Sequence, residues 1–177
     1  MNRAAQLVVM SLIIGALAFF ALGLRARGEV QPSSGVAPDF SLTTFDGQTI
    51  RLSQFRGKIV VINFWASWCI PCREEAAFLE QAWRAYKERG VVFIGVNWSD
   101  PEPDARKYLK EYAITYYNGI DLGTKIGQAY RIKGVPETFF VGKDGNLRGN
   151  ILGPITPTSG FMTPNEFLKR LDALLSE

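Results

Sequence analysis

The chain contains no histidine and only two cysteines, Cys69 and Cys72. The absence of histidine excludes His-ligated metal sites and Ser-His-Asp triads, because both need an imidazole. It also excludes a haem attached at these cysteines, since that motif needs a histidine where this chain has Arg73. Lys and Arg number 20 and Asp and Glu 17, without a block of one sign. This mild balance predicts no nucleic-acid partner.

Charged side chains are also absent from residues 4–24, AAQLVVMSLIIGALAFFALGL. A helix of this length spans about 30 Å, the thickness of one hydrocarbon core. A cleaved signal peptide is the alternative, but the apolar run is longer than usual and no clean A-x-A site follows it. We predict an uncleaved signal anchor with one transmembrane helix over 1–24, a flexible linker over 25–36 and one globular domain over 37–177.

Two apolar runs in the globular part, IVVINFWAS at 59–67 and VVFIGVN at 91–97, are typical of buried parallel strands. A shorter strand is predicted near 116–120. Asp-Gly turns predict a hairpin around Asp46 and a strand pair over 138–153. Helices are predicted over 70–89, 100–113, 122–131 and from Thr163 onward. This order predicts an α/β domain with a parallel sheet core between helices and a hairpin at one edge.

The predicted helix over 70–89 has two faces, and Gly90 is expected to end it. Its apolar stripe is predicted to face inward: Ala76, Leu79, Trp83 and Tyr86. Its polar side chains are predicted to face water: Arg73, Glu80, Arg84 and Lys87.

The stretch WCIPC at 68–72 admits several interpretations. A zinc site needs four ligands, and two thiols without histidine leave carboxylates to complete it. A static disulfide would enclose only two residues and would restrict the unfolded chain very little. Two uninvolved buried cysteines are a further alternative. We predict no metal and no cofactor.

A redox pair has a physical basis here. The motif ends a predicted strand and begins a predicted helix, which places Cys69 where free N–H groups and the helix dipole favour a thiolate. Cys72 lies one turn further on the same side, where it can close a disulfide and release a bound partner. Trp68 is predicted to shield the pair from one side; a plain packing aromatic is the alternative.

The stretch FWASWCIPC resembles the thioredoxin active site. Together with the N-terminal segment, the PDFSL…DGQTIRLSQFRGK lead-in and GVPETFFVGKDG, residues 36–177 resemble the membrane-tethered TlpA/ResA/CcmG-like branch of the thioredoxin superfamily. The resemblance implies a thioredoxin-like fold, with a central mixed sheet flanked by helices, an N-terminal β-hairpin and a central insert around 98–119. It also implies an extracytoplasmic thiol-disulfide oxidoreductase of the cytochrome c maturation type.

The resemblance also assigns roles to residues. Cys69 matches the nucleophile and Cys72 the resolving cysteine. Pro136 matches the cis-proline beside the disulfide, and Val135 before it offers its backbone to a substrate strand; the alternative is a trans proline at a strand start. Glu137 is implied in acidity or substrate choice, with a surface glutamate as the alternative. Trp68 completes the predicted substrate-binding set.

Glu75 is the third predicted catalytic residue. It follows Cys72 by three residues, so helical spacing turns it toward the buried stripe. A half-buried carboxylate beside a thiol has a raised pKa and can shuttle the proton of that thiol. The resemblance places a glutamate at this position; a solvated glutamate beside Glu74 is the alternative. Asn63 stands where ordinary thioredoxin has a buried aspartate, and because an amide cannot titrate, more weight falls on Glu75.

The expected function is disulfide reduction at the cytoplasmic membrane by a single-pass protein, a monomer with its catalytic domain outside. The expected partners are a protein disulfide or dithiol, by resemblance an apocytochrome c CxxCH, and a membrane electron donor of the CcdA/DsbD type. One alternative is a thiol peroxidase, which requires a threonine where this chain has Ala66 or Cys69. Another is a non-catalytic module that binds copper or protein; copper carriers of this fold resemble a CxxxC-plus-His pattern, which is missing here.

Overall fold

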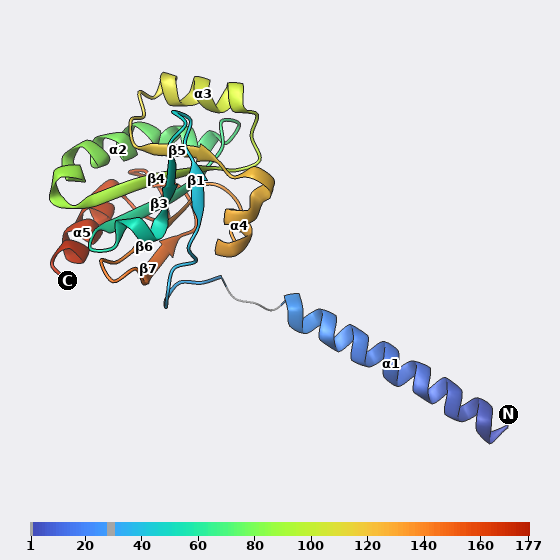
Figure 1. Cartoon of the computed structure of the whole chain (residues 1–177). Helices are drawn as coiled ribbons and strands as arrows, with labels where there is room; N and C mark the ends of the chain where they lie inside the picture. The colour runs from blue at the N-terminus through green and yellow to red at the C-terminus, as the bar shows by residue number, and fades with distance from the viewer. Residues whose placement is uncertain (1, 28–30) are drawn as a thin grey trace. The chain divides into compact units, whose positions relative to one another are not determined.

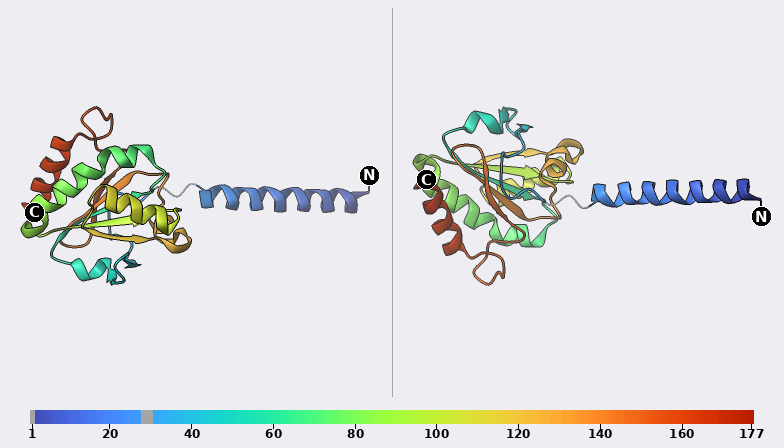
Figure 2. Two further views of the ribbon diagram at one scale, coloured as in Figure 1. Left: turned by 90° about the horizontal axis from the view of Figure 1, so that it is seen from above. Right: turned by 90° about the horizontal axis from the view of Figure 1, so that it is seen from below.

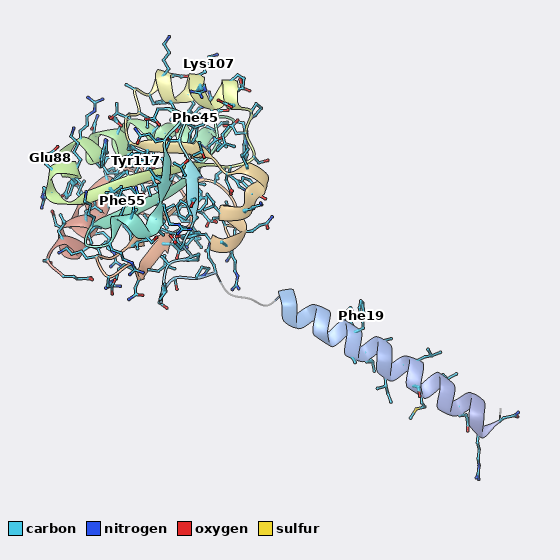
Figure 3. All side chains as sticks on the ribbon, viewed as in Figure 1. Phe19, Phe45, Phe55, Glu88, Lys107 and Tyr117 are labelled. Carbon is cyan, nitrogen blue, oxygen red and sulfur yellow. A yellow bond between two sulfur atoms is a disulfide. The ribbon has the colours of Figure 1, made fainter. Side chains whose placement is uncertain are left out.

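The computed structural model describes residues 2–27 and 31–177. The chain divides into one unit up to Gln31 and a second from Pro32 to Glu177. The first unit contains the helix α1, Arg3–Arg27, which carries Phe19 (Figure 3). Within the two described ranges, no helix combines the length and apolar character needed to cross a membrane. The transmembrane helix predicted over 1–24 is therefore not confirmed.

The second unit is built on a five-stranded sheet of order β5-β4-β3-β6-β7 (Figure 1). Its strands are β3 (Ile59–Trp65), β4 (Val91–Asn97), β5 (Tyr117–Ile120), β6 (Glu137–Val141) and β7 (Leu147–Ile151). β3 and β4 pair in parallel, as do β4 and β5, whereas β6 pairs antiparallel with both β3 and β7. The predicted mixed sheet is confirmed, and every residue of β3 and β4 is buried.

Four helices surround this sheet: α2 (Ile70–Tyr86), α3 (Glu102–Glu111), α4 (Lys125–Tyr130) and α5 (Pro164–Leu175). Short 3₁₀ turns, η1 (Leu52–Phe55), η2 (Lys87–Arg89) and η3 (Leu122–Thr124), connect other elements. α2 and α5 cover one face of the sheet, while the hairpin segment and α4 cover the other (Figures 1 and 2). Ile59 and Val61 pack with α2 and α5, whereas Val60 and Ile62 pack on the opposite face, because side chains alternate along a strand.

The hairpin predicted around Asp46 is present as β1 (Ser41–Thr43) and β2 (Thr49–Arg51). It forms its own two-stranded sheet, joined to β5 by an isolated bridge between Thr44 and Gly119. Phe55 and Tyr117, with ring centroids 5.7 Å apart, close the space between this segment and β5 (Figure 3). The hairpin is therefore packed on the central sheet and is not one of its edge strands.

The linker predicted over 25–36 is shorter in the structure. Residues 25–27 belong to α1, and 28–30 lie outside the described residues. Ser33 O and Gly35 O accept from the N–H groups of Gly149 and Leu147, at 3.0 and 2.7 Å. Residues 33–36 therefore lie along β7, because the unpaired edge of β7 offers donors that an extended chain can satisfy.

The ends of α2 and α5 follow the sequence signals. Gly90 ends the α2 region with a left-handed φ of 87°, and Thr163 and Glu166 form the predicted capping box of α5. The predicted exposure of Glu80 is wrong, because its carboxylate is buried and accepts from Thr115 N and Oγ1 at 2.8 and 2.6 Å. Position 80 lies beside the apolar stripe, and the segment before β5 covers it.

Candidate active site

Cys69 and Cys72 form a disulfide at the point where β3 leads into α2. Cys69 is the N-cap of α2, and its Sγ accepts from the N–H of Cys72 at 3.1 Å. Sulfur at this position receives a free helix N–H and the positive end of the helix dipole, both of which favour a thiolate after reduction. The predicted placement of the pair at a helix N-terminus is confirmed.

The peptide bond between Val135 and Pro136 is cis, as the resemblance implies. Cys69 Sγ lies 3.5 Å from the main-chain O of Val135, so the reduced thiol can donate to that carbonyl. Two loops that are 66 residues apart in the chain thus meet at the reactive sulfur. The roles of Val135 and Pro136 toward a substrate stay predictions.

Glu137 is buried, with only 3% of its surface exposed. Its Oε1 accepts from the N–H groups of Lys133 and Gly134 at 2.6 and 3.2 Å. The surface alternative for Glu137 is therefore wrong. The buried carboxylate stabilises the turn that precedes Pro136 by accepting these two backbone hydrogen bonds. A direct contact of Glu137 with a substrate stays a prediction.

Trp68 is 54% exposed beside the disulfide, so it is not a plain core aromatic. Its indole Nε1 donates to Ser99 O at 3.1 Å, and its ring lies 6.4 Å from that of Trp98. Ile70, the first residue of α2 and the one after Cys69, is also exposed. Together they present apolar surface next to Cys69.

Glu75 is almost completely buried, with 1% exposure. Its Oε1 accepts from Asn63 Nδ2 at 2.9 Å and its Oε2 from Ile155 N at 2.8 Å. Burial raises the pKa of Glu75 to about 7, although these two hydrogen bonds act in the opposite direction. The solvated alternative is wrong, and a carboxyl group that titrates near neutral pH lies one helical turn after Cys72.

Four further residues organise the site, and sequence reasoning did not select them for it. Asp100 accepts from Ser67 N and Oγ at 2.6 and 2.7 Å. Arg73 donates to Ser67 O through Nε and Nη2 at 2.9 and 2.7 Å. Tyr108 Oη donates to Cys72 O at 2.8 Å. The available signal was position: Asp100 follows the end of a parallel strand next to β3, at the same sheet edge as the CxxC.

The described residues offer no group of three or more Cys, Asp or Glu side chains placed to hold a metal ion. The Cys69–Cys72 pair can exchange two electrons with the dithiol or disulfide of another molecule. The site combines a sulfur pair at a helix N-terminus, which favours the attacking thiolate, with a carbonyl acceptor at Val135 and a buried acid at Glu75.

Comparison with known proteins agrees with this chemistry. Residues 34–150 match the AhpC/TSA family. A thiol-disulfide oxidoreductase ResA of Bacillus cereus is 32% identical over 152 residues, which are 85% of this chain and 88% of that protein. A ResA of Geobacillus kaustophilus is 36% identical over 120 residues, 68% of this chain and 69% of that protein.

Solved structures show the same fold. A thiol:disulfide interchange protein of the thioredoxin family from Chlorobium tepidum has a TM-score of 0.70 at 27% identity, covering 84% of this chain and 99% of its own. A secreted disulfide oxidoreductase of Mycobacterium tuberculosis, homologous to Escherichia coli DsbE, has a TM-score of 0.67 at 27% identity and covers 76% and 96%. The chain therefore belongs to the AhpC/TSA family of thioredoxin-like proteins and, within it, to the ResA-like thiol-disulfide oxidoreductases.

Proposed function

We propose that this oxidoreductase works as a reductase of protein disulfides outside the cytoplasm, tethered to the membrane by its N-terminal segment. The observation that carries the proposal is the Cys69–Cys72 pair at the N-terminus of α2, beside Val135 O and one turn from buried Glu75. Trp68 and Ile70 are exposed on either side of Cys69, which is itself buried, and they present apolar surface to a protein partner.

The reaction is a two-electron exchange. The Cys69 thiolate attacks one sulfur of the substrate disulfide, the substrate S–S bond breaks, and the other substrate sulfur leaves as a thiolate that takes up a proton. The Cys72 thiolate then attacks Cys69 Sγ, which releases the second substrate sulfur and forms the Cys69–Cys72 disulfide. The substrate gains two electrons, and the enzyme ends in the oxidised form that the structure shows.

Glu75 serves as the proton acceptor for Cys72 in the second step. Cys72 is a thiol until it must attack, and a carboxylate close by on the same helix can take its proton. A pKa of about 7 leaves the carboxyl group able both to accept that proton and to give it up again at neutral pH.

Membrane tethering is supported by the uncharged run over 4–24 of the sequence. An oxidising compartment would keep the pair as a disulfide, so a reductase there needs a supply of electrons. We infer a membrane donor of the CcdA/DsbD type, which would re-reduce Cys69 and Cys72 after each cycle.

The proposed client is the CxxCH disulfide of an apocytochrome c. The support comes from the resemblance of GVPETFFVGKDG, of the PDFSL…DGQTIRLSQFRGK lead-in and of the N-terminal segment to the cytochrome-maturation branch. An extended CxxCH segment could pair with the backbone at Val135. The peroxidase alternative is disfavoured, because Ala66 offers no hydroxyl and the hydroxyl of nearby Ser67 is bound to Asp100.

The test is a trapping experiment with the full chain. A Cys72→Ala variant cannot release its substrate, so it should accumulate mixed disulfides through Cys69 when expressed in its own host. We expect dithiothreitol-sensitive adducts that contain c-type apocytochromes, identified by mass spectrometry. The matched control is Cys69→Ala, which should yield none.

Two results would contradict the proposal. Reduced wild-type protein that leaves the disulfide of a CxxCH peptide intact would exclude this client. Steady consumption of hydrogen peroxide by the Cys72→Ala variant, at a rate above its exchange with disulfides, would favour the peroxidase.

A further inference from the structure

The turn after β4, residues 98–100, interlocks with the loop that precedes the disulfide. Trp98 N donates to Trp65 O at 2.9 Å, and Ser99 O accepts from the Trp68 indole at 3.1 Å. Ser99 has a left-handed φ of 51°. A residue other than glycine keeps this backbone conformation only where its surroundings hold it.

Asp100 makes the strongest connection between these two segments. One carboxylate oxygen accepts from Ser67 Oγ at 2.7 Å, and the other accepts from Ser67 N at 2.6 Å and from Asn97 Nδ2 at 2.8 Å. Asn97 is fully buried, and its Oδ1 has no hydrogen-bond partner among the described residues. Hydrogen bonds to an ionised carboxylate are about twice as strong as neutral ones.

The position of Asp100 makes this arrangement unexpected. An aspartate just before a helix ordinarily caps that helix with its side chain. Here the N-cap of α3 is Pro101, and α3 has no side-chain cap. The Asp100 carboxylate is thus turned away from its own helix and toward the active-site loop.

The N–H, the hydroxyl and the carbonyl of Ser67 each form a hydrogen bond to a charged side chain. Asp100 accepts hydrogen bonds from the N–H and the hydroxyl of Ser67, and Arg73 donates to the carbonyl of Ser67. Cys69 comes two residues later, and its N–H donates to Ala66 O at 3.2 Å. The path from β3 to the N-cap of α2 is therefore fixed at Ser67, directly before the nucleophile.

We propose that Asp100 is a positioning residue for thiol-disulfide exchange, which holds Ser67 so that Cys69 Sγ stays at the N-terminus of α2 and against Val135 O. The contacts that depend on this placement are the 3.1 Å bond from Cys72 N and the 3.5 Å approach to Val135 O. Asp100 touches neither sulfur in these contacts and acts only through Ser67. The proposal rests on the exchange activity alone, whatever the client or the direction of electron flow.

The test uses the full chain in a Cys72→Ala background, so that Cys69 is the only thiol. Asp100→Asn keeps the shape of the side chain but replaces one acceptor by a donor, and Ser67→Ala removes one hydrogen bond and keeps the carboxylate charge. The matched control is Asp104→Asn, which makes the same charge change at an exposed site in the first turn of α3. The readouts are the pH profile of Cys69 alkylation and the rate of exchange with a small aromatic disulfide.

We expect Asp100→Asn and Ser67→Ala both to move the alkylation profile to higher pH, because a displaced sulfur loses the helix N–H that stabilises its thiolate. At a pH below the midpoint of the wild-type alkylation profile, the fraction of Cys69 present as thiolate should fall about three- to tenfold, the change that a shift of half to one pH unit produces, and exchange should slow with it. Asp104→Asn should leave the profile and the rate unchanged.

Every other pattern overturns the proposal. A profile that moves to lower pH in Asp100→Asn would mean that Asp100 acts as a nearby negative charge. Unchanged profiles in either Asp100→Asn or Ser67→Ala would mean that their bonds serve the fold alone. If Asp100→Asn does not fold, as judged by circular dichroism, Ser67→Ala by itself decides the outcome.

Discussion

At the scale of single residues, the site depends on how burial changes the chemistry of one carboxyl group. Glu75 is charged and solvated in the unfolded chain, where its pKa is 4.5, and it is enclosed in the folded chain, where the pKa is about 7. Its two hydrogen bonds, from Asn63 and Ile155, stabilise the ionised form but do not offset the loss of water. The residue that is suited to move a proton is therefore also a source of instability.

Glu75 should make the protein less stable as the pH rises. Below pH 4.5 both states are protonated and the group has no effect. Between pH 4.5 and 7 the folded state binds more protons, so stability falls with rising pH and levels off above about pH 7. The full difference is on the order of 3 kcal/mol. Urea denaturation of Glu75→Gln from pH 4.5 to 8 should show that the variant gains stability relative to wild type across this window.

The matched control for this prediction is Glu74→Gln, at the exposed neighbouring position. It should reproduce the pH dependence of the wild type. Parallel stability curves for Glu75→Gln and wild type would show that Glu75 titrates at the same pH in the folded and unfolded chains.

At the scale of elements, the segment between β4 and β5 supports α2, the helix that begins at the disulfide. Tyr108 of α3 stacks on Trp65 at the end of β3, with ring centroids 4.3 Å apart, and bonds to Cys72 O. Trp65 in turn donates from Nε1 to Asn118 of β5 at 2.9 Å. The neighbouring strand β4 carries Gly95, because a side chain there would collide with Asn118 Oδ1 and approach Trp65 Nε1.

Gly95→Ala should therefore destabilise the fold through this aromatic contact. The added methyl group must displace Asn118, which breaks the bond to Trp65 and overpacks the space between β4 and β5. Substitutions of this kind cost about 1–3 kcal/mol. The free energy of unfolding from urea titration, together with the near-ultraviolet circular dichroism of the tryptophans, measures the effect.

Gly160→Ala is the control for this substitution, because a methyl group at position 160 meets open space. It should change stability by less than about 0.5 kcal/mol. Equal effects at positions 95 and 160 would mean that the close approach of Gly95 to Asn118 is not what limits that position.

At the scale of the whole molecule, the boundary of the catalytic unit lies closer to α1 than the composition of the linker indicates. Ser33 and Gly35 bond to β7, and Ala37 N donates to Gly145 O at 3.1 Å. The bonds of Ser33 and Gly35 cover the outer edge of β7, which would otherwise be free to pair with another chain, and that of Ala37 reaches the turn before β7. Pro/Gly/Ser-rich composition predicts a flexible segment. Composition carries no information about β7, whose open edge lies far along the chain and forms hydrogen bonds with this segment.

Two truncations should differ for this reason. A chain that starts at Pro32 keeps all three bonds to the β7 segment, whereas one that starts at Pro38 loses them. Since each hydrogen bond contributes about 0.5–1.5 kcal/mol, the loss of three should make the shorter chain less stable by about 1.5–4.5 kcal/mol. Urea denaturation measures the difference, and light scattering should show more aggregation of the shorter chain. Identical stability and solubility would place the boundary at residue 37.

The sequence alone determined the elements and the nucleophile pair. Uninterrupted apolar runs predict β3 and β4, the 3.6-residue spacing predicts α2, and the capping box predicts α5. These signals are local, so they can be followed along the chain. Cys69 and Cys72 are recognised in the same way, because four consecutive residues at the start of one helix carry the motif.

The tertiary structure alone decided which distant groups surround the pair. Asp100, Tyr108 and Ile155 reach the site from three separate segments, and no local period or spacing links them to Cys69. Burial of Glu80 and Glu137 was decided in the same way, since a carboxylate loses its water only when other segments close over it. The physical reason is that patterns along the chain record which face an element buries, whereas the partners across that face follow from how the sheet brings the elements together.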